Sequence, residues 1–238
     1  MSGHSKWSTI KHKKAKLDAA RGKVFTKVVK EITVAAREGG GDPEGNARLR
    51  TVLDKAKACN MPQDNIARAI KKGTGELEGA HYEAVTYEGY GPAGTAVMVE
   101  ALTDNRNRTA ADLRHVFTKN HGNMAEGGAV AWMFEHKGVV RATGSINEDE
   151  LLEKLLDYDI DDISSYDGIV TVSCAIKDLY AVKKVVEDAG LKVDDAQIEW
   201  LAKTPMHLDH KDEEEKVFKF LEALEDNDDV QNVYSNIG

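Results

Sequence analysis

The charge of this chain is divided between two parts, and the division limits what each part can bind. Residues 1–72 hold seventeen Lys and Arg against seven Asp and Glu, a net charge of +10. The rest of the 238-residue chain carries −19, which gives a total of −9. A negative charge spread evenly over the chain would make nucleic acid an unfavourable partner. The division instead predicts a basic N-terminal module on an acidic body, typical of proteins in which one module binds nucleic acid.

The positive charge is densest between Gly3 and Lys30, where nine Lys and Arg accompany a single acid, Asp18. Such a run repels itself and usually needs an anionic partner. Trp7 lies at its edge, and bases that stack on an aromatic ring often accompany phosphate contacts. A solvated tail is the alternative interpretation. The predicted nucleic-acid-binding residues are Lys6, Trp7, Lys11, His12, Lys13, Lys14, Lys16, Arg21, Lys23, Lys27, Lys30, Arg48 and Arg50.

Three helices are predicted in this basic module. Apolar residues recur at three- and four-residue spacing over 17–38, which predicts an amphipathic helix. A shared helical spacing places four lysines on one polar stripe: Lys16, Lys23, Lys27 and Lys30. Asp42 and Pro43 are expected to supply the N-cap and first residue of a second helix. Pro62 is expected to start a third helix, which Gly73 stops. Together they predict a small bundle with one basic face.

After Gly79 the pattern changes to short strands. Strands are predicted at 84–88, 96–101 and 129–134, with a helix at 106–119. Residues 137–203 follow the order strand, helix, strand, strand, helix, strand, which is a complete ferredoxin-like unit. A last helix at 211–224 and a strand at 229–234 would complete the earlier set. The predicted class is α+β: a basic three-helix module (1–78), a middle α/β domain (79–136 plus 204–238) and an inserted ferredoxin-like domain (137–203).

Several long, ordered motifs closely resemble the YebC family. They are Gly3-His4-Ser5-Lys6-Trp7, Ile10-Lys11-His12-Lys13-Lys14, Arg21-Gly22-Lys23, Asn60-Met61-Pro62-Gln63-Asp64-Asn65-Ile66, Ala69-Ile70-Lys71-Lys72-Gly73, Tyr87-Glu88-Gly89-Tyr90-Gly91-Pro92, Leu102-Thr103-Asp104-Asn105-Arg106-Asn107-Arg108-Thr109 and Trp132-Met133-Phe134. That family is usually described as probable transcriptional regulators, and it includes the mitochondrial translational activator of cytochrome c oxidase. The resemblance implies the same three-domain plan and a role in controlling gene expression.

The loop Gly89-Tyr90-Gly91-Pro92-Ala93-Gly94 formally matches the dinucleotide-binding pattern G-x-G-x-x-G. That pattern requires a helix next, whose N-terminal amides hold the pyrophosphate. Here a β-branched, strand-like segment follows, and Pro92 lacks one amide donor. The loop is therefore predicted to be the turn of a hairpin.

Other candidate sites are weaker. Arg106 and Arg108, in the first turn of a predicted helix, are candidates for an anion or partner contact, and pairing with Glu100 or Asp112 is the alternative. His207 and His210 alone make a weak zinc set, and Asp157, Asp159, Asp161 and Asp162 lack the spacing of a calcium loop. No nucleophile elbow or P-loop appears. We expect no enzyme, no metal and no cofactor.

The place of action and the partners follow from the same features. Cys59 and Cys174 form no motif, and the sequence has neither a signal-peptide pattern nor an apolar run long enough to span a membrane. We expect a cytoplasmic protein that does not enter membranes. Its first expected partner is DNA, as a transcriptional regulator. The alternative is ribosomal RNA, as a translation factor. The acidic α/β domains are expected to face the ribosome or another protein.

Overall fold

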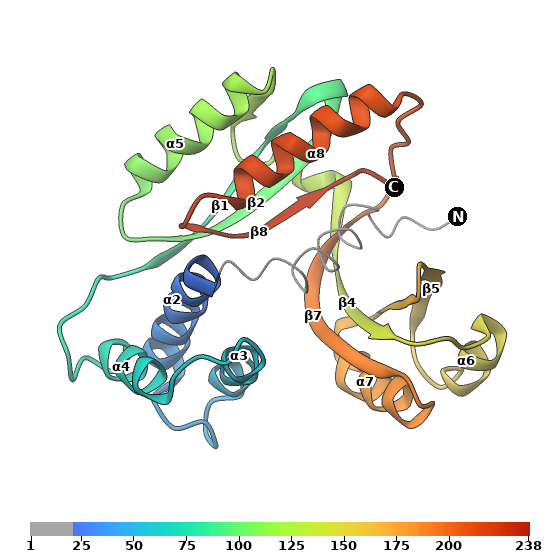
Figure 1. Ribbon diagram of the computed structural model, residues 1–238, viewed down its shortest axis with the longest axis horizontal. Helices are drawn as coiled ribbons and strands as arrows, with labels where there is room; N and C mark the ends of the chain where they lie inside the picture. The colour runs from blue at the N-terminus through green and yellow to red at the C-terminus, as the bar shows by residue number, and fades with distance from the viewer. Residues whose placement is uncertain (1–20) are drawn as a thin grey trace.

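The computed structural model describes residues 21–238, which form a helical module and two four-stranded antiparallel sheets. The helical module and the second sheet lie on the same side of the first sheet (Figure 1). The α+β class predicted from the sequence is confirmed. None of the helices within residues 21–238 is long and apolar enough to cross a membrane.

The helical module consists of α2 (Arg21–Gly39), α3 (Ala47–Ala58) and α4 (Gln63–Gly73). Its core includes Ile32, Leu49 and Ala56, all fully buried. The prediction that Asp42 and Pro43 start the second helix is wrong. Asn46 is the N-cap instead, because its side-chain oxygen accepts a hydrogen bond from the backbone amide of Leu49. Its side-chain amide donates to the carbonyl of Ala35 in α2 and to that of Gly40, which follows α2.

The first sheet has the strand order β3-β1-β2-β8. Its strands are β1 (Glu83–Tyr90), β2 (Ala96–Thr103), β3 (Asn123–Ala125) and β8 (Val230–Ser235). Helices α5 (Arg106–Lys119) and α8 (Lys211–Glu225) lie along one face of it (Figure 1). They pack through Phe117 and Phe220, whose rings meet edge to face at 5.0 Å. The sheet thus takes its last strand from the C-terminal part of the chain.

The strand expected at 129–134 is not formed. Residues Ala131–Met133 form a 3₁₀ turn, η2, and the edge strand is β3. The carboxylate of Glu88 accepts hydrogen bonds from the amides of Gly128, Val130 and Ala131. Because these amides are already bonded, they cannot join a strand ladder.

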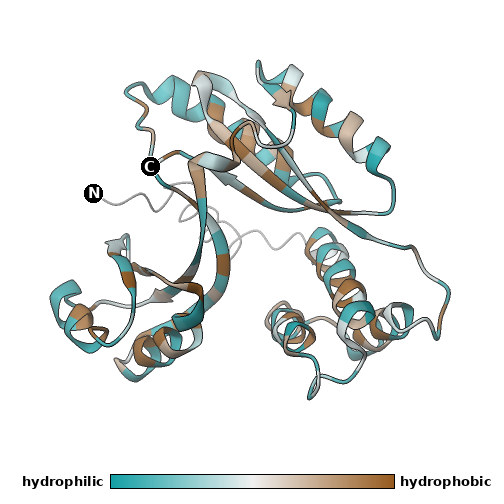
Figure 2. Cartoon of the chain, turned by 180° about the vertical axis from the view of Figure 1, so that it is seen from behind, coloured by the Kyte–Doolittle hydropathy of each residue, from teal (hydrophilic) through white to brown (hydrophobic). Residues whose placement is uncertain are grey.

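The second sheet has the order β5-β6-β4-β7 and the ferredoxin-like connection predicted for this region. Its elements are β4 (Phe134–Thr143), α6 (Glu148–Lys154), β5 (Ile160–Tyr166), β6 (Ile169–Cys174), η3 (Ile176–Asp178), α7 (Leu179–Asp188) and β7 (Lys192–Ala202). Its hydrophobic core lies between the sheet and the two helices. Hydrophobic residues are concentrated in the strands and on the inner sides of the helices (Figure 2). The domain boundaries at residues 78, 136 and 203 stay a prediction.

The loop with the G-x-G-x-x-G pattern is the turn of the β1–β2 hairpin, as predicted, and includes a short turn, η1 (Pro92–Gly94). Its glycines have packing reasons. A Cβ at Gly91 would lie 2.4 Å from the ring of Phe220, and one at Gly89 would lie 2.5 Å from the carbonyl of Asn123. Gly94 has a φ of +75°, which L side chains rarely adopt. The pattern therefore arises from close packing of this hairpin.

Candidate nucleic-acid interface

The predicted binding residues are divided between two parts of the chain. Lys6, Trp7, Lys11, His12, Lys13, Lys14 and Lys16 lie outside the residues that the structure describes. Arg21 is the first residue of α2. Lys23, Lys27 and Lys30 follow it on one face of that helix, because their spacing of four and three residues matches the helical period.

This lysine stripe, defined as Lys23, Lys27 and Lys30, contacts the C-terminal end of α8. The ammonium of Lys23 lies 2.9 Å from Oδ1 of Asp226, and that of Lys27 lies 2.8 Å from the carbonyl oxygen of Glu225. The carbonyls at a helix C-terminus carry partial negative charge, and the last turn of α8 contains no basic residue of its own. The lysine stripe supplies the missing positive charge and joins the helical module to the first sheet.

Burial rises along the stripe. Lys23 is exposed, Lys27 is partly buried, and Lys30 is buried with an exposed fraction of 6%. The Lys30 ammonium donates to Oδ1 of Asp229 at 2.6 Å and to the carbonyl of Asp228 at 2.8 Å. It also lies 5.5 Å from the ring centre of Tyr82. Lys30 therefore joins α2 to the residues that follow α8, and only the Lys23 end of the stripe is open to solvent.

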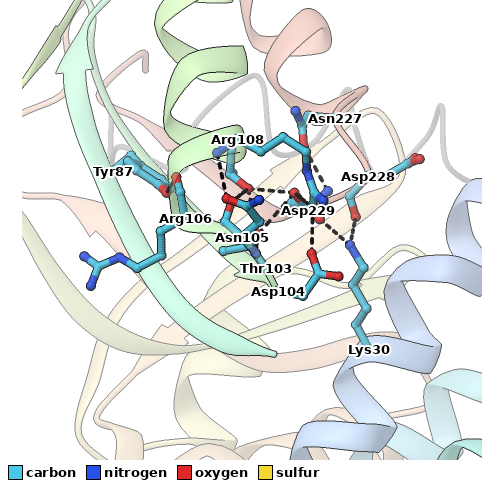
Figure 3. Close-up of polar contacts among 11 residues, drawn as sticks. Lys30, Tyr87, Thr103, Asp104, Asn105, Arg106, Arg108, Asn227, Asp228 and Asp229 are labelled. Atoms are coloured by element: carbon cyan, nitrogen blue, oxygen red, sulfur yellow. Dashed lines mark hydrogen bonds and ion pairs between the residues drawn. The ribbon is translucent and has the colours of Figure 1, made fainter. Parts of the chain in front are cut away.

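Asp229 is the centre of a buried polar cluster between α2, α5 and β8 (Figure 3). Its Oδ2 accepts from Arg108 at 2.8 Å and from the hydroxyl of Thr109 at 2.6 Å, in addition to the contact of Oδ1 with Lys30. Burial alone would raise the pKa of the Asp229 carboxyl, but the hydrogen bonds from Arg108, Lys30 and Thr109 outweigh it and lower the pKa to about 2.

The two arginines of the first turn of α5 differ. Arg108 pairs with Asp104 and Asp229, both at 2.8 Å, and the hydrogen bond to Asp229 is the main reason why the pKa of its guanidinium is raised. The side chain of Arg106 points away from the cluster (Figure 3), and no ion pair to it occurs among residues 21–238. Arg106 thus stays a candidate for an external anion, whereas Arg108 is part of the polar cluster around Asp229.

The partners suggested for these arginines from sequence were wrong. Glu100 instead accepts hydrogen bonds from Trp200, Asn232 and Tyr234. Asp112 lines a pocket of about 370 Å³ beside the polar cluster, together with Lys30, Tyr82 and Asp228. The pocket lies where α2 meets the first sheet.

The two arginines of α3 are exposed. Arg48 forms an ion pair with Glu38 of α2, which is itself half exposed. Such a surface pair contributes little to stability, so the arginine can exchange the glutamate for another anion. Arg48 and Arg50 therefore stay available for phosphate.

Sequence reasoning missed Asp226 and Asp229. Both belong to the acidic segment that follows α8, yet no local pattern connects it with lysines about two hundred positions earlier. Within residues 21–238 no three His, Cys, Asp or Glu side chains come together as a metal site.

The geometry can be set beside known proteins. A family model described as the second and third domain of TACO1/YebC matches residues 82–237, and one described as the TACO1/YebC N-terminal domain matches residues 5–76. A protein of Citrifermentans bemidjiense, named a probable transcriptional regulatory protein, is 55% identical over 99% of this chain and 95% of its own length. A protein of Chlorobium chlorochromatii with the same name is 53% identical over 100% and 95%. The crystal structure of a conserved hypothetical protein from Aquifex aeolicus matches with a TM-score of 0.85 and 48% identity, over 96% of this chain and 95% of that one.

Proposed function

This chain belongs to the TACO1/YebC family, and on that premise we propose that it is a nucleic-acid-binding regulator of gene expression whose helical module contacts phosphate. The first candidate target is DNA, in line with the name of the relatives, probable transcriptional regulatory protein. The proposal includes no catalytic step and no cofactor, and it places the protein in the cytoplasm.

The observation that carries the proposal is the positive charge of the first 72 residues, +10 against −19 in the rest. The contacts that we assign to phosphate are those of the N-terminal lysines, Lys23 and the two arginines of α3. Lys27 and Lys30 are reassigned to the contact with the end of α8, because their ammonium groups are partly buried and buried against carbonyl and carboxylate oxygens, whereas the side chain of Lys23 is half exposed.

Ribosomal RNA, bound by a translation factor, is the second candidate target. Lysine–phosphate contacts set affinity and orientation but carry no sequence information. They suit RNA as well as DNA, so the charge favours neither. Crosslinking in cells followed by sequencing of all bound DNA and RNA distinguishes promoter fragments from ribosomal RNA.

The proposal is tested by the salt dependence of binding. Replacing Lys11, Lys13, Lys14 and Lys16 by Ala should weaken binding to a fluorescent duplex or RNA. It should also reduce the slope of log affinity against log salt concentration, by about 0.7–0.9 for each phosphate that the variant no longer neutralises. A charge-matched control replaces four lysines of the acidic body: Lys154, Lys177, Lys183 and Lys184. Equal effects of the two variants would contradict the proposal.

A further inference from the structure

Two aromatic side chains, Trp132 and Tyr90, lie exposed near each other at the end of the first sheet. Trp132 exposes 67% of its surface and Tyr90 exposes 37%. The indole Nε1 of Trp132 donates to the carbonyl of Ala129 at 3.1 Å, and the hydroxyl of Tyr90 donates to the same oxygen at 3.3 Å. One backbone carbonyl therefore holds the polar ends of both rings, and the rings are neighbours. We call these two residues the aromatic pair.

The loop that carries Trp132 is fastened to the sheet. The carboxylate of Glu88 on β1 accepts from the amides of Gly128, Val130 and Ala131 at 2.7–2.9 Å. Glu88 is buried, and burial would raise its pKa, but the three amides outweigh burial and keep the pKa below its ordinary value. The side chain of Val130 is fully buried beside these bonds. The loop is thus held in one conformation, and the exposed position of Trp132 is built in.

The chemistry of the aromatic pair limits what can bind there. The hydrogen-bonding groups of both residues are bonded within the protein, so the rings offer mainly their faces and apolar edges. Beside them, the ammonium of Lys203 donates to the carbonyl of Trp132 at 2.9 Å, and the amide of Lys203 donates to the carbonyl of Met133. The ammonium of Lys203 is therefore held at the backbone of Trp132, the residue whose ring is exposed.

We propose that the aromatic pair is a stacking platform for an unpaired base of a single-stranded nucleic acid, with Lys203 beside it for the adjoining phosphate. Every base has a π face, so such stacking is sequence-tolerant, and a neighbouring lysine matches the charge of the strand. The inference extends the proposed function: the helical module supplies phosphate affinity, and the aromatic pair adds a contact that requires a base. A duplex, whose bases are stacked on one another, could not use it.

The experiment compares two fluorescent 12-mers, oligo(dT) and an abasic oligomer with the same phosphates, bound to the full chain at fixed salt. The wild-type protein should bind oligo(dT) more tightly. Trp132→Ala should lose about five- to 150-fold in affinity for oligo(dT), the range expected for one stacked base, and should bind the abasic oligomer unchanged. Trp132→Phe should keep most of the difference. Tyr166→Ala is the matched control, because Tyr166 exposes 59% of its surface on the second sheet.

The outcomes separate this inference from the proposed function. Equal affinity of the wild-type protein for both oligomers would overturn the stacking platform and leave phosphate binding by the helical module standing. A weakening caused equally by Trp132→Ala and Tyr166→Ala would also overturn it. Absence of binding to either oligomer, with duplex binding retained, would overturn the platform alone. Absence of binding to any nucleic acid would overturn both. Thermal unfolding of each variant shows whether it is folded.

Discussion

The two ends of the lysine stripe on α2 make the same kind of contact in different surroundings. At one end, Lys23 and Asp226 pair at 2.9 Å with exposed fractions of 50% and 75% for their side chains. At the other, Lys30 and Asp229 pair at 2.6 Å with 8% and 7%. Both pairs join the same helix to the end of α8 and the residues after it, but they differ in burial and in the further donors, Arg108 and Thr109, that bind Asp229.

The comparison shows that one helical face serves two purposes. An exposed ion pair is screened by water and salt and contributes little, whereas removing one partner of a buried pair leaves an uncompensated charge. The buried end therefore holds the helical module against the first sheet. The exposed end can exchange its aspartate for a phosphate, because breaking that pair costs little.

The largest effect is expected at Asp229. Asp229→Ala removes the shared partner of Lys30 and Arg108 and leaves the buried ammonium of Lys30 without a carboxylate, near the half-exposed guanidinium of Arg108. The free energy of unfolding should fall by about 3–5 kcal/mol in urea titration. Asp228→Ala is the control, because Lys30 contacts only the backbone carbonyl of Asp228. If both substitutions lowered the free energy of unfolding equally, the carboxylate of Asp229 would not be what stabilises the buried end of the stripe.

Acid should weaken the buried end within a defined range. The pKa of Asp229 is about 2 in the folded protein, below the ordinary value of 3.8. The unfolded chain therefore binds the proton first, and the contribution of Asp229, about 2 kcal/mol, is complete above pH ~5 and is lost as pH falls through ~2. Unfolding measured between pH 5 and pH 2 should show this decrease in the wild-type protein. In Asp229→Asn the same interval should be flatter, and an unchanged slope would contradict the assignment.

Lys27, in the middle of the stripe, should have an intermediate effect. Its ammonium donates to the carbonyl of Glu225 in a partly buried position. Lys27→Met keeps most of the apolar stem and removes the donor, so we expect a decrease of about 1 kcal/mol in the free energy of unfolding. If Lys27→Met lowered the free energy of unfolding as much as Asp229→Ala, the energies of these contacts would not follow their burial.

The smallest effect on stability is expected at Lys23. Lys23→Ala should cost less than about 1 kcal/mol, and the cost should shrink further in 0.5 M salt. Its effect on nucleic-acid affinity should exceed that of Lys27→Met, because only the Lys23 end of the stripe is exposed. Anisotropy titrations of both variants check this order, and the reverse order would remove Lys23 from the interface.

Features with a local period could be predicted from sequence. The helix expected at 106–119 is α5 with the same bounds, and the ferredoxin-like order of the second sheet follows the predicted sequence of elements. The edge strand was misplaced because Glu88, forty residues earlier in the chain, takes the amides that a strand would need. The helical spacing of the lysine stripe was visible, but its acceptors lie about two hundred residues away, beyond any local pattern.

The pairing of β2 with β8 has a consequence for how the protein is made. On the ribosome, the second sheet, from Phe134 to Ala202, is synthesised before α8 and β8 emerge. The nascent first sheet must therefore wait with the edge of β2 unpaired and without Phe220 in its core. A message truncated after Ala202 would yield a chain that also lacks Asp229, so its helical module would lose the buried contact of Lys30. An unpaired, apolar strand edge is a template for aggregation, which makes such a product a target for cellular quality control.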